Sequence, residues 1–282
     1  MSSWQPRIPF KAYFMKFITY QDKKIAYKTE GKGAAVVLLH GFCEDSSIWE
    51  EFRVDLLEEN YRVIRIDLPG FGKSEVLPDA SIEQMAEAVH AVLLKLNLAK
   101  VVFIGHSMGG YVGLAFARLY PELLMGLGLF HSHPYADSEE KKENRRKSVA
   151  FIQRQGHALF VKQLIPNLFN QRFAKSNAFL IEKLTYRAAR GKSAGIIAAQ
   201  KAMIERPDET STLKSLNVPV LFIIGEEDQA VPPENAEQIH LPQAASIHIL
   251  EKVGHMGLFE ARKQTQRIVR QFVQFCEENA RA

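Results

Sequence analysis

Short apolar runs alternate along the chain with segments whose apolar residues have helical spacing. Runs such as VVLL (36–39), VVFI (101–104) and VLFII (220–224) contain no polar residue. Strands buried on both faces of a parallel sheet have this composition, whereas half-exposed strands alternate. The expected strands are 14–20, 24–29, 36–39, 61–66, 101–104, 123–130, 218–224 and 246–250.

Helical patterns fill most of the intervals between these strands. They cover 48–57, 82–96, 108–119, 234–240 and 258–278. The first two strands are joined too closely for a crossover, so we expect them to form an antiparallel edge. The sequence therefore predicts an α/β fold with a mostly parallel eight-stranded sheet and helices on both faces.

The connection between residues 130 and 218 is much longer than the dozen or so residues that a crossover needs. Helical patterns occur there at 139–155, 157–168, 178–189 and 194–205. We expect a helical lid between strands six and seven, lying over the carboxyl ends of the strands. The predicted division is a core of residues 1–133 and 214–282 and a lid of residues 134–213.

The predicted lid is basic. Residues 134–213 hold 15 Lys and Arg against 8 Asp and Glu, whereas the whole chain has a net charge of +4. A basic lid would favour anionic substrates. The run EEKKENRRK (139–147) is also what a solvated helix face carries, with Glu143 and Lys147 spaced for an ion pair, and this is the simpler interpretation.

Composition argues against a membrane-spanning, secreted or disulfide-rich protein. The longest apolar runs are far shorter than a bilayer requires, and the first residues lack the apolar core of a signal peptide. Two cysteines are too few for a disulfide framework. We therefore expect a cytoplasmic protein with a small-molecule substrate, no nucleic-acid or membrane partner and no cofactor. The oligomeric state has no signature in the sequence.

The segment GHSMG (105–109) stands directly between a buried apolar run and a helical pattern. On such a sharp turn the serine hydroxyl projects outward and is exposed. Gly105 and Gly109 leave room at positions where side chains would collide across the turn. The amides that begin the following helix point to the same place, which suits an oxyanion. Ser107 is the predicted nucleophile, and the neighbouring His106 is expected to have a packing or hydrogen-bonding role.

A serine nucleophile needs a base and a group that orients the base. Asp228 follows the seventh predicted strand and precedes Pro232 and Pro233, and His255 follows the last strand between two glycines. The order serine, acid, histidine is one of the known orders of this triad. Asp228 is therefore the predicted acid and His255 the predicted base.

An oxyanion hole needs two backbone amides. One is expected from Met108, the residue after the nucleophile. The other is expected from Phe42 in the loop HGFCED (40–45), where Gly41 allows close approach of the backbone. Cys43 in the same loop is interpreted as a packed thiol.

These segments together resemble the α/β-hydrolase family over nearly the whole chain. The matching segments are HGF (40–42), DLPGFGKSE (67–75), GHSMGG (105–110), GEEDQAVPP (225–233) and GHMGLFE (254–260). The resemblance implies the α/β-hydrolase fold, a lid after strand six and a structural role for Asp67. Serine at the elbow argues against the dehalogenase and epoxide hydrolase branches, which carry aspartate there. In its motifs and its predicted lid, the chain resembles small esterases, lactonases, carbon–carbon bond hydrolases and cofactor-free haloperoxidases.

His131 and His133 follow the sixth predicted strand in the pattern HSHP. On a strand both rings would share a face, as in some metal sites, but no further ligand set is evident. We expect no metal, and we expect the two histidines to line the substrate pocket or pack at the lid hinge.

The predicted activity is that of a carboxylesterase-type serine hydrolase working through an acyl-enzyme. Two alternatives remain open. The same triad could serve a carbon–carbon bond hydrolase, a lyase or an acyltransferase, or the fold could act as a non-catalytic ligand receptor.

Overall fold

The computed structural model describes residues 14–234, 242 and 244–281 and contains an eight-stranded sheet in the order β1-β2-β4-β3-β5-β6-β7-β8. The first two strands pair antiparallel, β2 pairs antiparallel with β4, and all other neighbours are parallel. The strands are β1 (Lys16–Tyr20), β2 (Lys23–Glu30), β3 (Ala35–Leu39), β4 (Arg62–Ile66), β5 (Val101–His106), β6 (Leu124–Phe130), β7 (Val220–Gly225) and β8 (Ala245–Leu250). All eight expected strands are confirmed to within a few residues.

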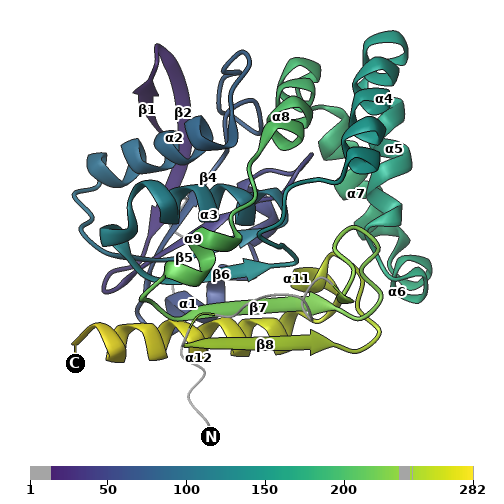
Figure 1. Ribbon diagram of the computed structural model, residues 1–282. Coiled ribbons are helices and arrows are strands. Elements are labelled where there is room, and N and C mark those ends of the chain that lie inside the picture. The colour runs from purple at the N-terminus through teal and green to yellow at the C-terminus, as the bar shows by residue number, and fades with distance from the viewer. Residues whose placement is uncertain (1–13, 235–241, 243, 282) are drawn as a thin grey trace, which may run out of the picture.

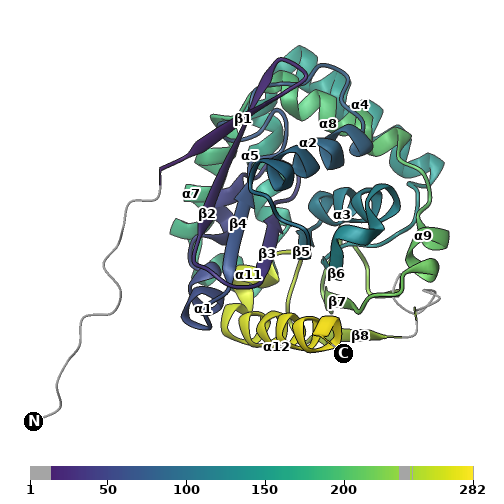
Figure 2. The ribbon, with the colours of Figure 1, turned by 90° about the vertical axis from the view of Figure 1, so that its left-hand side faces the viewer.

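Helices cover both faces of the sheet (Figures 1 and 2). On one face lie α2 (Ile82–Lys95) and α3 (Met108–Leu119), and on the other lie α1 (Arg53–Glu58) and α12 (Arg262–Arg281). Strands β3, β5 and β7 are buried along their whole length between these layers, as their apolar composition predicts. The mostly parallel sheet covered on two faces is therefore confirmed.

Two of the expected helices are interrupted. The segment 48–57 divides into a 3₁₀ helix, η1 (Ser46–Trp49), and α1, and the bend brings the rings of Trp49 and Phe52 together against Phe130. The segment 258–278 begins as α11 (Gly257–Glu260) and resumes in α12 after Ala261, whose φ of −129° is not helical. All but the first residue of the expected helix 234–240 lie outside the described residues.

Six helices occupy the connection between β6 and β7. They are α4 (Glu139–Gln155), α5 (His157–Asn167), α6 (Gln171–Ser176), α7 (Ala178–Ala189), α8 (Ser193–Glu205) and α9 (Thr210–Ser215). The sequence predicted all of them except α6 and α9, each too short to show a helical period. In Figure 1, α4 to α7 lie beyond the arrowheads of β6 and β7, at the carboxyl ends of the strands.

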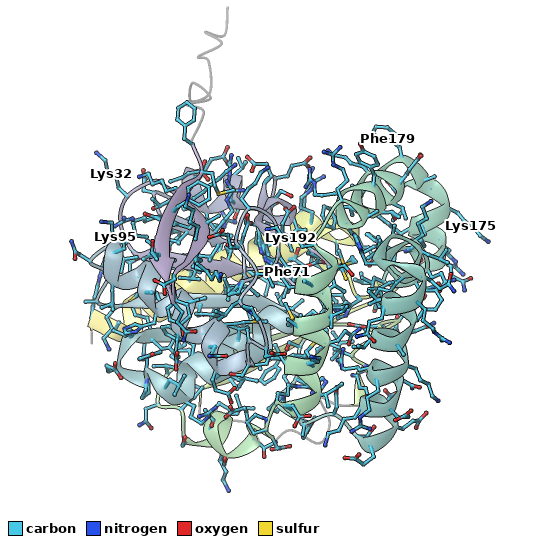
Figure 3. All side chains as sticks on the ribbon, turned by 90° about the horizontal axis from the view of Figure 1, so that it is seen from above. Lys32, Phe71, Lys95, Lys175, Phe179 and Lys192 are labelled. Atoms are coloured by element: carbon cyan, nitrogen blue, oxygen red, sulfur yellow. The ribbon has the colours of Figure 1, made fainter. Side chains whose placement is uncertain are left out.

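The inserted helices contact the loops of the core. Figure 3 shows Phe71 and Lys192 at the boundary between the two parts, and the Lys192 ammonium donates to the Ser74 carbonyl at 2.5 Å. Gly70 and Gly195 meet so closely across this boundary that a Cβ atom on Gly195 would lie 2.2 Å from the Gly70 carbonyl oxygen. Within the described part of the chain, no helix combines the length and apolar character needed to cross a bilayer.

Candidate active site

Ser107 occupies a strained turn between β5 and α3. Its φ of 50° and ψ of −116° lie outside the regions that non-glycine residues favour, at a cost of about 1–3 kcal/mol. Two hydrogen bonds hold the turn, from the Ser107 amide to the Phe130 carbonyl at 2.9 Å and from the Gly110 amide to the Ser107 carbonyl at 2.8 Å. A Cβ atom on Gly105 would lie 2.2 Å from the Gly109 carbonyl oxygen, so the turn requires glycine there.

Asp228 and His255 lie together although they follow different strands. The Asp228 Oδ2 atom is 2.8 Å from His255 Nδ1, and its Oδ1 atom accepts from the amides of Ala230 and Val231 at 2.9 Å. Burial alone would raise the pKa of the Asp228 carboxyl. Electrostatic attraction to His255 and hydrogen bonds from the His131 and His255 rings outweigh burial and hold this pKa well below its usual range.

Ser107 and His255 both line one cavity of about 680 Å³. Since His255 Nδ1 faces Asp228, the other ring nitrogen, Nε2, is the one free to accept a proton. The three residues predicted as a triad are therefore brought to one place, with the serine and the histidine on the same cavity wall.

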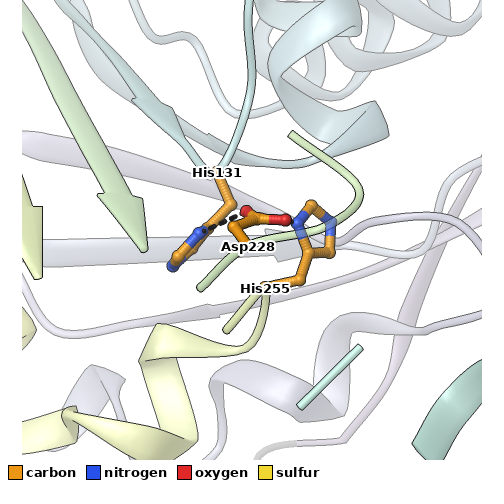
Figure 4. A group of neighbouring side chains, drawn as sticks. All are labelled: His131, Asp228 and His255. Atoms are coloured by element: carbon orange, nitrogen blue, oxygen red, sulfur yellow. Dashed lines mark hydrogen bonds and ion pairs between the residues drawn. The ribbon is translucent and has the colours of Figure 1, made fainter. Parts of the chain in front are cut away.

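His131 makes a second contact with the Asp228 carboxylate (Figure 4). Its Nδ1 atom lies 2.9 Å from Asp228 Oδ2, and its Nε2 atom accepts from the Gly257 amide at 3.2 Å. One nitrogen donates and the other accepts, so the ring is neutral. Burial lowers the pKa of His131 to about 4 in spite of the adjacent carboxylate.

His133 is also buried, and it lines a separate small cavity beside Tyr111. Its Nε2 atom is 3.3 Å from the Tyr111 hydroxyl, and its Nδ1 atom accepts from the Tyr135 amide at 3.2 Å. Neither His131 nor His133 is among the residues that line the cavity with Ser107. Their positions favour hydrogen bonding to other residues near the site, rather than the lining of the substrate pocket that was one of the two roles expected from the sequence.

The closest grouping of possible metal ligands among the described residues is this same cluster. His131, Asp228 and His255 each offer one ligand atom, and these atoms lie within 4.8 Å of one another (Figure 4). The Nδ1 atoms of both histidines already donate to Asp228. A cation here would have to replace those hydrogen bonds, so these three side chains suit proton transfer better than metal binding.

The loop after β3 approaches the nucleophile closely. A Cβ atom on Gly41 would lie 3.1 Å from Ser107 Cβ, and Phe42 lines the cavity. Neither the Phe42 amide nor the Met108 amide has an acceptor among the described residues. The Met108 amide follows Ser107 directly, the Phe42 amide follows a residue that approaches Ser107, and neither is hydrogen-bonded to another described residue.

Glu44 and His106 form a buried pair beside this loop; a packing or hydrogen-bonding role was expected for His106, but no role was predicted for Glu44. The Glu44 Oε2 atom accepts from the Gly41 amide at 2.6 Å and lies 3.0 Å from His106 Nδ1. His106 Nε2 faces the His255 carbonyl at 2.9 Å. Both partners of the His106 ring are acceptors, so the ring is an imidazolium that donates twice.

The pKa values agree with this assignment. Burial opposes the charge of His106, but the Glu44 carboxylate outweighs it and raises the pKa of the ring. The pKa of Glu44 is lowered, again against burial, chiefly by the charge of His106. Through these hydrogen bonds the Glu44–His106 pair connects the loop after β3, the turn at Ser107 and the loop that carries His255.

The cavity wall is mixed in character. The core contributes Ser107, His255, Phe42 and Tyr111, and the inserted helices contribute Lys141, Asn144, Arg145, Phe160, Leu164, Gln200 and Met203. Cys43 lies instead on a smaller cavity of about 40 Å³ behind Glu44. Burial raises the pKa of the Cys43 thiol well above its usual value, which keeps it protonated and unreactive.

Comparison with known proteins gives consistent matches. The family model described as alpha/beta hydrolase fold matches residues 34–262. A putative 2-succinyl-6-hydroxy-2,4-cyclohexadiene-1-carboxylate synthase of Bacillus subtilis is 31% identical, over 91% of this chain and 97% of the relative. A 2-hydroxy-6-oxo-6-(2'-aminophenyl)hexa-2,4-dienoic acid hydrolase of Metapseudomonas resinovorans is 28% identical, over 88% and 87%.

A solved structure extends the match to the fold. A thermophilic esterase from Thermogutta terrifontis, with malate bound, superposes with a TM-score of 0.87 at 34% identity, covering 93% of this chain and 99% of that one. The family model spans the elbow, both loops of the site and the inserted helices. The chain therefore belongs to the α/β-hydrolase family and is a hydrolase-type enzyme.

Proposed function

We propose that the protein is a carboxylesterase-type serine hydrolase that cleaves a carboxylic ester or related acyl substrate through an acyl-enzyme. One observation carries the proposal: a strained serine and a histidine oriented by a buried aspartate face the same cavity. A serine hydroxyl becomes a useful nucleophile only with such a base beside it.

The proposed reaction follows from the positions of the groups. His255 Nε2 takes the proton of Ser107 as the serine oxygen attacks the substrate carbonyl, and Asp228 stabilises the imidazolium that forms. The amides of Phe42 and Met108 donate to the oxyanion. The leaving alcohol departs with the proton from His255. Water then attacks the acyl-enzyme, gives its proton to His255 and releases the acid together with free Ser107.

We further propose that the helices between β6 and β7, residues 134–213, act as a lid. Helices α4, α5 and α8 contribute side chains to the cavity that holds Ser107, which supports this role. A lid at this position would control access and contact the part of the substrate remote from the cleaved bond.

A second candidate reaction is carbon–carbon bond hydrolysis with the same residues. It is favoured by the names of relatives such as the dienoic acid hydrolase, at 28% identity. A panel that sets simple esters against β-diketones would separate the two activities, because only a carbon–carbon hydrolase turns over the diketones.

The proposal is tested by labelling the whole protein with a fluorophosphonate and measuring intact mass. We expect one adduct on the wild type and none on Ser107→Ala, since only an activated serine attacks the probe. Ser132→Ala is the matched control, because Ser132 is a buried serine outside the cavity. A folded wild type that takes no label would contradict the proposal and favour a ligand receptor.

A further inference from the structure

Helix α4 presents polar side chains to the cavity. Lys141, Asn144, Arg145 and Ser148 all line it, at the spacing that places residues on one helix face. The only buried apolar residue of α4 is Ile152. The neighbouring helix α5 lines the same cavity with Phe160 and Leu164, so the polar face of α4 is a local feature of the wall.

This wall carries more positive than negative charge. The buried Asp137 carboxylate accepts from Arg145 at 2.5 Å, forms an ion pair with Arg206 at 2.9 Å, and lies 4.0 Å from the Lys141 ammonium. One carboxylate thus faces three cations. The exposed Glu140 adds a further negative charge to this wall. Glu44 also lines the cavity, but its charge is paired with His106, so an excess of positive charge remains.

Lys141 is the cation of this group with the weakest partner. Arg145 is held on two sides, by Asp137 and by Gln200 at 3.0 Å, and Arg206 donates to two carbonyls and forms an ion pair with Asp137. The Lys141 ammonium has the Ala230 carbonyl at 3.3 Å and, among the residues that the structure describes, no carboxylate within hydrogen-bond distance. Its charge is therefore available to a ligand in the cavity.

The state of His133 supports a positive potential in this region. Burial is the largest cause that lowers its pKa, and the charges of Lys141, Arg206 and Arg145 lower it further, to about 3. Asp137 acts in the opposite direction and does not compensate.

We propose that Lys141, supported by Arg145, binds a carboxylate on the substrate, at the end remote from the bond that is cleaved. The substrate class is then a half-ester of a dicarboxylic acid or an ester whose alcohol part bears a carboxylate. This inference rests on the proposed function and deepens it. It also selects the first interpretation of the basic segment, a substrate-binding wall, over a solvated face for Lys141 and Arg145.

The test compares esters that differ in one charge. On the acyl side, para-nitrophenyl hydrogen adipate is compared with the para-nitrophenyl ester of the adipic acid monoamide. On the alcohol side, the butyrate ester of meta-hydroxyphenylacetic acid is compared with that of its amide. The ratio of kcat/KM between charged and amide substrate is the readout. We expect at least about a tenfold preference for the charged member of one pair, because a charge-assisted hydrogen bond replaces a neutral one.

Variants of two adjacent lysines identify the group responsible. Lys141→Gln is expected to reduce the preference to near unity, mainly through KM, and Lys141→Glu to reverse it. Lys142→Gln is the matched control, because Lys142 pairs with Glu139 and does not line the cavity. The preference of the wild type and of Lys142→Gln should also weaken in high salt.

The outcomes separate the two proposals. Equal rates on charged and amide esters, or a preference that survives in Lys141→Gln, would overturn the carboxylate site and leave the serine hydrolase intact. A wild type that hydrolyses none of the four esters and takes no fluorophosphonate label would overturn both.

Discussion

Asp228 accepts hydrogen bonds from two histidine rings and two backbone amides. Four donors on one buried carboxylate fix both its charge and its position. Glu44 and His106 repeat the arrangement nearby, as an ion pair that reaches the backbone of both His255 and Gly41. The Glu44–His106 pair therefore links the loop after β3 to the loop that carries His255.

Glu44→Gln is expected to lower kcat by about 10- to 100-fold with a smaller change in KM, since it removes a charge-assisted hydrogen bond that positions the site. Glutamine can still accept from the Gly41 amide, but it removes the negative charge that keeps His106 an imidazolium. The measurement is kcat per fluorophosphonate-labelled site, so that unfolded protein is not counted.

A double-mutant cycle with His106→Asn is the control for this positioning role. Because the two side chains act through one contact, the double variant should lose little more than either single variant. Losses that multiply, or an unchanged kcat in Glu44→Gln, would show that the pair does not position the site.

At the scale of the elements, β6 and α12 pack closely against each other. Gly126 in β6 lies under Cys276 of α12, and a Cβ atom at position 126 would be 2.3 Å from Cys276 Sγ. The same atom would be 3.4 Å from Cys276 Cβ, an ordinary contact. The absence of a side chain at 126 therefore allows the sulfur atom to sit against the strand.

Gly126→Ala is expected to lower the free energy of unfolding by about 1–3 kcal/mol, because an added methyl group must displace the helix. Cys276→Ala in the same chain removes the colliding sulfur and should recover part of that loss. Urea denaturation of the two single variants and the double variant measures both effects. Equal destabilisation with and without the sulfur would mean that the strain lies elsewhere.

On the scale of the whole molecule, folding buries two histidines in the neutral state. The pKa values of His131 and His133 are about 4 and about 3, below the ordinary value of 6.5. Between pH 6.5 and these lowered pKa values, the two histidines bind protons in the unfolded chain but stay neutral in the folded chain. Lowering the pH through this window therefore favours unfolding. The raised pKa of His106 stabilises the folded state, and this contribution is fully present below pH 6.5, so it does not add to the loss.

The free energy of unfolding is expected to fall between pH 6.5 and 4, by up to about 1.4 kcal/mol per pH unit for each of these histidines. His133→Asn keeps an acceptor for the Tyr135 amide but cannot be protonated in this range. Its profile against pH should therefore be shallower than that of the wild type. Parallel profiles from urea denaturation at a series of pH values would refute the assignment of His133.

The strands and the sharp turn at Ser107 could be predicted because each depends on residues close in sequence. An apolar run of residues indicates a buried strand, and Gly105 and Gly109 indicate the sharp turn at Ser107. The short helices α6 and α9 were missed because six residues are too few to show a period. The break at Ala261 leaves the apolar pattern unaltered, so periodicity could not reveal it.

The role of each charged group depends on contacts between distant parts of the chain. Glu44 and His106 are 62 positions apart, and His131 and Asp228 are 97 apart, so no local pattern records either pair. The sequence showed that residues 134–213 are basic, but only the packing of α4 against the cavity turned Lys141 inward and left Lys142 outside. Local sequence encodes backbone conformation through neighbouring residues, whereas burial and pairing of charges arise only when the folded chain brings separate segments together.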